Sequence, residues 1–382
     1  MKFTFFYHSV VSCWNNPTAH MLRGICRALI ARGHEVSVWE PMDGWSRANA
    51  MLDGGVFALR SAERLVPGLD IRPYWPETLN LDTALQGADV VIVQDWNAPE
   101  LIAAIGARRV AGGAFTLLFH DTLHRTAGAL DQFERLEIHG YDGVLACGEK
   151  LREVYLTKGW GQQVSTWHAA ADTGLFRPVE GQKKAMDLVW MGNWSEGERS
   201  LKLREFLLEP IAQLGLYARM HGTRYPAEVQ ADLVARGIDY AGWLPNHRAP
   251  AAFASALFTV DMPPRASVTA LPGMPSLRMF EALSCGIPLV STPWDDAAGL
   301  FPEGCYITAR NGAEMTAAFA SLDHDPDLRE TLIGNGLAVI CARHSCAHRV
   351  GDLIAIVDRL RGPVGAPQNS KATAAPRLDM AL

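Results

Sequence analysis

The feature that most constrains the fold is the strand-like stretch Ala88-Asp-Val-Val-Ile-Val93, which is continuously apolar from Val90 onward. A strand with one face in water alternates apolar and polar residues, whereas a strand of a parallel sheet is covered on both faces and is apolar throughout. Further strand patterns occur at Phe3–Tyr7, Phe115–Phe119 and Asp187–Met191, and helical patterns such as His20–Arg32 lie between them. This alternation predicts an α/β protein built on doubly wound parallel sheets.

The chain is long enough for two such domains of roughly 150 to 200 residues each. We expect an N-terminal Rossmann-like domain over residues 1–175 and a second one over residues 185–345, with the polar run Glu180–Lys184 as linker. Residues 346–361 carry a helical apolar stripe and are predicted to form a crossover helix. Residues 362–382 are rich in Pro, Ala and polar side chains, which is typical of a disordered tail.

Two segments have weaker patterns. Residues 42–80 contain no strong motif, and we expect a helix and irregular structure there, with Arg72–Pro76 as a turn because of its two prolines. In the second half, Ala252–Leu257 is expected to be helical and Phe258–Met262 to be the strand that follows it.

Composition excludes some classes of function. The net charge of −6 gives no support for nucleic-acid binding. No apolar run reaches the length of a membrane span, so no integral membrane segment is expected. Seven cysteines, an odd number scattered through a large chain, are typical of reduced thiols. These features predict a cytoplasmic protein, either free or peripheral at the inner face of the membrane.

A Pro/Gly-rich loop opens a short helix within Leu271–Ser291, and Ser276 is expected to cap that helix with its side chain. The first N–H groups of a helix and the helix dipole favour an anion. Glu281 lies one turn further in, and helical side chains lean toward the N-terminus, so its carboxylate can accept from ribose hydroxyls. The stretch thus predicts a nucleotide diphosphate site, although its apolar spacing also suits a core helix. The residues at the helix mouth are Met274, Pro275, Ser276 and Leu277.

The run Pro275–Val290 resembles the donor-site segment of the GT-B glycosyltransferases, and Asp172 and Phe176 keep the spacing of the family's domain junction. The resemblance implies two Rossmann-like domains facing across a cleft, a last helix that returns to the N-terminal domain, and a ribose contact for Glu281. The commonest motif has a second Glu eight residues earlier, where this chain has Gly273. Together with the upstream Gly-Trp-Leu-Pro-Asn run, this pattern is most similar to the spore-maturation CgeB-like branch.

Further donor contacts are implied by the resemblance, because departure of a nucleoside diphosphate builds negative charge that cations and N–H groups must meet. In this family the loop after the strand at Asp187–Met191 supplies a Gly and basic side chains, and the Gly-Trp-Leu-Pro-Asn segment lines the base pocket. A solvated basic helix face and a core tryptophan are the alternatives. The residues assigned to the donor in this way are Gly192, Arg199, Lys202 and Trp243. Arg265 is expected to lie beside the Leu271–Ser291 stretch as a further diphosphate partner. The first loop, Trp14–Thr18, lacks the Gly-Gly pair that the family often has there, and Asn15 and Asn16 are taken as its ligand contacts without support from the motif.

The acceptor side is expected at the ends of two strands of the first domain, because ligands of open α/β sheets lie at the carboxyl ends. Asp95 and Asn97 follow one of these strands, and His120 and Asp121 end the next. In the family a His at this point contacts the transferring sugar, which implies that role for His120. Asp121 is expected either to orient it or to cap the following helix, and a strand-end histidine satisfied by backbone is the alternative. The acceptor, whether glycan, lipid or small molecule, is left open.

The predicted activity is transfer of a sugar from a nucleoside diphosphate sugar to this acceptor. No Asp-x-Asp pair stands at a strand end, so we expect a metal-independent enzyme without a further cofactor. The nearby Cys341, His344, Cys346 and His348 do not share one helix face, which disfavours a metal site there. A sugar-nucleotide 2-epimerase of the same fold and a non-catalytic nucleotide-sugar-binding protein are the rival hypotheses.

Overall fold

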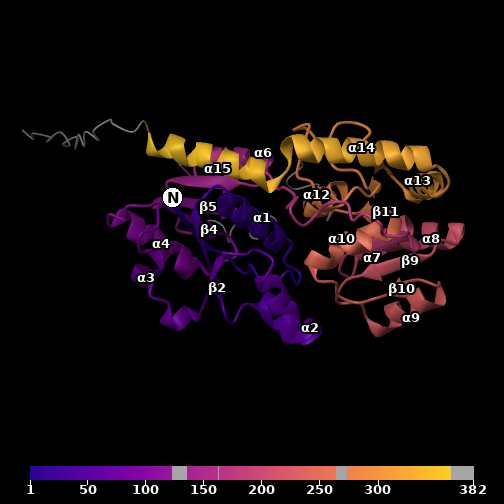
Figure 1. Cartoon of the computed structure of the whole chain (residues 1–382), viewed down its shortest axis with the longest axis horizontal. Coiled ribbons are helices and arrows are strands. Elements are labelled where there is room, and N and C mark those ends of the chain that lie inside the picture. The colour runs from indigo at the N-terminus through magenta and orange to yellow at the C-terminus, as the bar shows by residue number, and fades with distance from the viewer. Residues whose placement is uncertain (123–135, 162, 264–272, 363–382) are drawn as a thin grey trace, which may run out of the picture.

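Two α/β domains lie side by side in the computed structural model, each built around one parallel sheet (Figure 1). The predicted α/β architecture is thereby confirmed. Arg265 and the predicted tail from residue 363 onward lie outside the described residues. The structure describes residues 1–122, 136–161, 163–263 and 273–362.

The first sheet has the strand order β3-β2-β1-β4-β5-β6-β7, and each neighbouring pair in it is parallel. Every residue of β4 and β5 is buried, as the continuous apolar runs predict for central strands. The strands are β1 Lys2–Phe6, β2 Glu35–Pro41, β3 Asp70–Tyr74, β4 Val90–Gln94, β5 Thr116–Asp121, β6 Gly143–Ala146 and β7 Val164–Thr166.

Helices cover this sheet (Figure 1). Helix α1 follows the loop after β1, and its first residue, Thr18, faces the second domain across the cavity. The helix α2 is interrupted at Gly55, where φ is 62° and ψ is −171°. Glycine adopts such backbone angles without steric cost, so the helix changes direction there. The helices of the described residues are α1 Thr18–Ala31, α2 Trp45–Glu63, α3 Leu81–Leu85, α4 Pro99–Val110 and α6 Glu149–Lys158, together with the 3-10 turn η1 at Pro76–Thr78.

The expectation of a turn at Arg72–Pro76 is wrong, because Asp70–Tyr74 pairs with β2 as the strand β3. This strand lies at the edge of the sheet. Proline lacks an N–H group and is tolerated in a strand where only one side needs ladder hydrogen bonds. Pro73 therefore marks an edge strand here rather than a break.

The second sheet has the order β10-β9-β8-β11-β12-β13, again with parallel neighbours. The strand expected at Phe258–Met262 begins two residues earlier, because Ala256 already pairs with Met186. The strands are β8 Met186–Met191, β9 Ala218–His221, β10 Asp239–Tyr240, β11 Ala256–Asp261, β12 Leu289–Ser291 and β13 Ile307–Thr308.

The helices from residue 185 onward are mostly short, apart from the last three, which have 13, 18 and 16 residues. Among the helices of the described residues, none combines the length and apolar character needed to cross a bilayer. The helices are α7 Glu198–Leu203, a π turn η2 Arg204–Leu208, α8 Glu209–Leu214, α9 Ala227–Ala235, a 3-10 turn η3 Asn246–Arg248, α10 Ala249–Ala254, α12 Leu277–Ser284, α13 Gly312–His324, α14 Pro326–Arg343 and α15 Cys346–Arg361.

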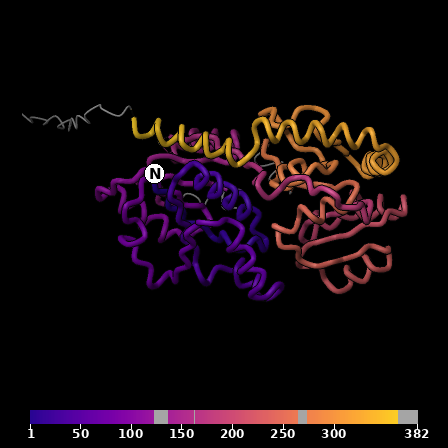
Figure 2. The backbone as a smooth tube through the Cα atoms, viewed as in Figure 1, coloured from indigo at the N-terminus to yellow at the C-terminus, as the bar shows by residue number. Residues whose placement is uncertain are grey.

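The last helix, α15, returns from the second domain and packs on the first, as Figure 2 shows for the yellow end of the chain. Its apolar residues share one core with α1 and the first strands. At Gly24 of α1 the approach is close, since a Cβ there would lie 2.5 Å from Cys346 Sγ and 2.6 Å from Asp172 Cβ. Arg27 donates to Asp172 at 3.3 Å beside this contact. The predicted crossover is confirmed.

Candidate active site between the domains

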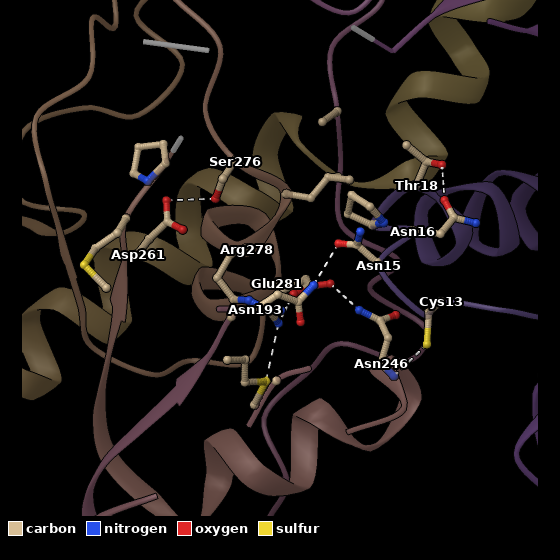
Figure 3. Close-up of a pocket in the computed structure, with 18 of the residues that line it drawn as sticks. Cys13, Asn15, Asn16, Thr18, Asn193, Asn246, Asp261, Ser276, Arg278 and Glu281 are labelled. Carbon is tan, nitrogen blue, oxygen red and sulfur yellow. Dashed lines mark hydrogen bonds and ion pairs between the residues drawn. The ribbon is translucent and has the colours of Figure 1, made fainter. Parts of the chain in front are cut away.

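A cavity of about 870 Å³ opens between the carboxyl edges of the two sheets (Figure 3). Its first wall comes from the loop after β1, the start of α1 and the ends of β4 and β5. Its second wall comes from the loops after β8, β9 and β10 and from the start of α12. Ligand sites of drug size have similar volumes, and open α/β sheets bind ligands at these ends.

Glu281, on α12, lines the cavity and is only 2 % exposed. Its Oε1 accepts a hydrogen bond from Asn246 Nδ2 at 2.6 Å, and its Oε2 forms an ion pair with Arg278. His20 of α1 is fully buried, and its Nδ1 lies 3.0 Å from Oε1. The carboxylate therefore contacts groups of both domains, and its proposed role toward ribose stays a prediction.

The charge of Glu281 follows from these neighbours. Burial would raise the pKa of the carboxyl group, but the cation of Arg278 and the contacts with His20 and Asn246 outweigh burial and lower the pKa to about 2. Glu281 is thus ionised at neutral pH. An ionised carboxylate of this kind is a strong acceptor for hydroxyl groups.

The expectation that Ser276 caps α12 with its side chain is wrong, because this side chain makes no hydrogen bond to the first N–H groups of the helix. Its Oγ instead donates to Asp261 Oδ2 at 2.8 Å, since β11 ends beside this turn. Met274, Pro275, Ser276 and Leu277 all line the cavity. The first N–H groups of a helix lack partners within the helix, so this mouth remains suited to an anion.

Asp261 ends β11 and is a cavity residue that sequence reasoning missed. It is 6 % exposed, and burial raises the pKa of its carboxyl group to about 6, with the hydrogen bond from Ser276 opposing the shift. The strand position before two prolines was the only signal, and it marks a strand end without indicating a ligand.

Basic side chains stand on the second wall. Arg199, Lys202 and Gly192, the last directly after β8, all line the cavity, and their contact with a diphosphate stays a prediction. Arg199 Nε donates to Asn193 O at 3.3 Å, and Lys202 Nζ lies 3.7 Å from Glu198 Oε1. Sequence reasoning missed Arg278, which also lines the cavity. Its position one turn before Glu281 on the same helix was the available signal.

The loop after β1 contributes Asn15 and Asn16 to the cavity. The side chain of Asn16 is buried and stabilises its own loop. It donates hydrogen bonds to Ser9 O and Ser12 O and accepts one from Thr18. Asn15 has a positive φ of 45° and reaches across the cleft, where its Oδ1 accepts from Asn193 Nδ2 at 2.7 Å. Asn15 is therefore better placed than Asn16 to meet a ligand between the domains.

Trp243 lines the cavity on the second domain and also meets the first domain. A Cβ on Gly54 of α2 would lie 2.8 Å from its ring. The glycine thus lets α2 approach the indole closely. Trp243 is in part an interdomain contact, and base stacking stays a prediction.

His120 lines the cavity and is buried at the end of β5. Tyr7 Oη lies 2.5 Å from its Nδ1, and the ring meets Trp167 edge to face. Burial lowers the pKa of His120 to about 3, so the imidazole is neutral at ordinary pH. A neutral ring fits a hydrogen-bonding role toward a sugar better than a proton-donating one.

Asp121 is not among the cavity-lining residues. Successive residues of a strand point to opposite faces, so its carboxylate turns away from His120 and accepts from Tyr155 Oη at 2.7 Å. Tyr7, not Asp121, is the partner of His120 Nδ1. The placement gives no support to the predicted catalytic role of Asp121.

Asp95 and Asn97 also lie behind the cavity wall. Asn97 Nδ2 donates to the carbonyls of Phe6 and Gln94, and Asp95 accepts from Thr122 Oγ1 at 2.7 Å. Trp96 and Thr122 are the neighbours that reach the cavity. Thr122 thus connects Asp95 to the cavity.

Within the described part of the chain, no three His, Cys, Asp or Glu side chains come together as metal ligands. In the cysteine and histidine run near the C-terminus, Cys341 is exposed whereas Cys346 is buried against α1. His344 Nε2 is bonded to Leu300 O at 2.7 Å. His344 and Cys346 are therefore buried in packing contacts, whereas Cys341 lies at the surface.

Comparison with known proteins gives two family matches, one on each domain. The model described as Glycosyltransferase Family 4 matches residues 18–175, and the model described as Glycosyl transferase-like matches residues 199–355. A comparison with curated proteins finds no match. The predicted linker, Glu180–Lys184, lies between the two matched ranges.

Solved glycosyltransferase structures share the fold across nearly the whole chain. A glycosyltransferase from Rickettsia africae ESF-5 superposes with a TM-score of 0.65 at 10 % identity, over 95 % of this chain and 99 % of that one. Anabaena Alr3699/HepE in complex with UDP and glucose gives 0.63 at 15 % identity, over 93 % and 98 %. T4 phage BGT in complex with UDP and Mn²⁺ gives 0.57 at 13 % identity, over 94 % and 100 %. With these matches on both of its domains, the chain is a glycosyltransferase of the GT-B fold.

Proposed function

We propose that this transferase uses a UDP-sugar as donor, binds it on the second domain, and passes the sugar to an acceptor at the first domain. The observation that carries the proposal is the buried, ionised Glu281 beside the mouth of α12, inside a cavity of suitable volume. The structural neighbours support the nucleotide, because HepE was solved with UDP and T4 phage BGT with UDP-glucose.

In the proposed complex the ribose hydroxyls donate to Glu281 in place of the contacts that Asn246 and His20 now supply. The diphosphate lies over the first N–H groups of α12, and Arg199 and Lys202 face the charge that grows on it as the sugar departs. The base lies toward Trp243. Because His20 belongs to the first domain, nucleotide binding at Glu281 is coupled to the fit between the domains.

On the acceptor side, the neutral His120 is proposed to hold the transferring sugar by a hydrogen bond from or to Nε2. Tyr7 supports this role because its bond to Nδ1 fixes the orientation of the ring. The acceptor approaches from the wall that carries Trp96 and Thr122.

We further propose that the donor binds without a divalent cation or another cofactor. The support is the positive charge that Arg199, Lys202 and Arg278 bring to the cavity wall, together with the helix mouth. Activity is therefore expected to survive excess EDTA. Dependence on added Mg²⁺ or Mn²⁺ would contradict this part.

Two finer assignments remain proposals. The Gly-Trp-Leu-Pro-Asn run and the Arg-Met-Phe-Glu281 sequence support membership of the CgeB-like branch. The seven cysteines are all free thiols, which supports a reducing, cytoplasmic location, with peripheral contact to the membrane inner face as an extension of it.

The test is incubation of the protein with a panel of UDP-, GDP- and dTDP-sugars, with and without EDTA, followed by analysis of nucleotide and sugar products. Slow release of UDP from UDP-sugars is expected even without an acceptor. Interconversion of sugar epimers without UDP release would support the epimerase hypothesis. Binding without any turnover would instead support a nucleotide-sugar sensor.

A further inference from the structure

We propose that Asp261 is the side chain that recognises hydroxyl groups of the transferred sugar. This inference rests on the proposed function and deepens it, because it names the residue that distinguishes a sugar nucleotide from the bare nucleotide. No motif marks Asp261, and the argument for it comes from the cavity itself.

Four carboxylates line the cavity among the described residues, namely Glu196, Glu198, Asp261 and Glu281. Glu281 is engaged by Arg278, Asn246 and His20. Glu196 accepts from Trp194 Nε1 and Glu198 pairs with Lys202, and both side chains are exposed at the rim. Asp261 is thus the one buried carboxylate of this set that is not already held by a cation.

The bonding of Asp261 leaves one oxygen for a ligand. Oδ2 accepts from Ser276 Oγ at 2.8 Å, whereas no described residue donates to Oδ1. Asp261 lines the cavity, and Figure 3 shows its carboxylate at the end of β11, facing Ser276. Oδ1 is not one of the enclosed polar atoms that lack a partner, so it is open to the cavity, where a ligand hydroxyl can donate to it.

The position of Asp261 fits a sugar better than a phosphate. Ser276 joins Asp261 to the mouth of α12, so the carboxylate lies next to the place proposed for the diphosphate. A carboxylate repels phosphate oxygens but accepts strongly from hydroxyls. The group attached to the diphosphate is the sugar, and it is the neutral, hydroxyl-bearing part of the donor.

The commonest family motif has a Glu where this chain has Gly273. The backbone at Gly273 does not favour any such side chain. This residue has a φ of 89°, in the left-handed region where a side chain is strained. Asp295 O would be 3.7 Å from an added Cβ, so the barrier is the backbone conformation rather than lack of room. Asp261, on a regular strand, presents its carboxylate without such strain.

The test compares UDP with UDP-glucose, UDP-galactose and UDP-N-acetylglucosamine by titration calorimetry on wild type and Asp261→Ala. We expect the ratio of the Kd of the preferred UDP-sugar to the Kd of UDP to rise about tenfold to a hundredfold in Asp261→Ala, the loss of a hydrogen bond to a charged group. The Kd of UDP itself is expected to stay the same or to fall. Glu196→Ala, at the rim, is the matched control and should leave the ratio unchanged.

An unchanged ratio in Asp261→Ala would overturn the proposal, as would equal weakening of UDP and UDP-sugars. If Asp261→Ala does not fold, Asp261→Asn keeps the shape and should reduce discrimination among the three sugars in kcat/KM. Failure of the wild type to bind UDP at all would instead refute the proposed function. The two failures are therefore distinguishable.

Discussion

Glu281 and Asp261 face the same cavity, yet their surroundings differ. The Glu281 corner contains Arg278, Asn246 and, from the other domain, His20. Among the described residues, the Asp261 corner contains one bonded donor, the hydroxyl group of Ser276. Both carboxylates are buried, but the pKa of Glu281 is lowered to about 2 and that of Asp261 is raised to about 6.

The difference shows that burial alone does not determine the protonation state of a carboxylate in this cleft. Burial raises the pKa at both positions, and a directly bonded cation reverses the direction at one of them. The two groups are accordingly suited to different parts of one donor. A permanently charged acceptor suits the ribose, and a lightly held one can adapt to the hydroxyl pattern of a sugar.

The largest expected effect is on the affinity for UDP, which should fall on loss of Glu281 and not on loss of Asp261. Glu281→Ala should weaken UDP binding by about 3 kcal/mol, roughly a hundredfold in Kd, because ribose hydroxyls lose a charged acceptor. The measurement is titration calorimetry with UDP. Asp261→Ala is the comparison variant and should bind UDP at least as tightly as wild type does.

Glu281→Gln separates loss of charge from loss of volume, since it keeps the side chain's size and one acceptor oxygen. The affinity of Glu281→Gln for UDP should lie between those of wild type and Glu281→Ala. Equal affinity of all these proteins for UDP, or absence of binding by the wild type, would remove the basis of the comparison.

The second effect is on stability against pH, and the two corners should respond with opposite sign. The lowered pKa of Glu281 contributes stability that is complete above its ordinary value of 4.5 and is lost as pH falls toward 2. The raised pKa of Asp261 favours the neutral form, so its contribution is present below 3.8 and is lost as pH rises through about 6. Each contribution is expected to be on the order of 2 kcal/mol.

Urea unfolding at fixed pH values checks these signs. Glu281→Gln should flatten the stability profile between pH 4.5 and 2, and Asp261→Asn should flatten it between pH 4 and 6. If both variants changed the same pH window, the two corners would not differ as described.

The smallest expected effect tests the diphosphate side of the donor. Arg199→Ala and Lys202→Ala should each weaken UDP binding by about 1 kcal/mol or less, because partly exposed cations are screened by solvent. The effect of Lys202 should be the smaller, since Glu198 lies 3.7 Å from its ammonium group. Uridine, which lacks phosphate, is the control ligand, and its affinity should be unchanged in both variants.

Most of the fold was predictable because buried parallel strands are apolar throughout and alternate with helices. The misassigned elements have local causes. Pro73 suggested a turn but lies in an edge strand. Ala256 and Leu257 favour helix by propensity, and pairing of Ala256 with Met186 overrides that preference.

The site was predictable only where one segment carries it. Glu281 and the mouth of α12 were found because loop, helix and carboxylate lie within a single stretch. His20 contacts Glu281 only because the two domains pack together, and no local sequence pattern indicates a contact between residues so far apart in the chain. Asn246 ended a motif that was assigned to the base, while Tyr7 lies at the end of an ordinary strand pattern.

The return of α15 to the first domain has a consequence for how the protein is made. Cys346, Val350, Leu353 and Val357 complete a core that begins with Phe3 and includes α1. A ribosome must therefore deliver the whole second domain before the apolar face of α1 can be covered, although domains generally fold in the order of their synthesis. The domain that is translated first is the one that is finished last.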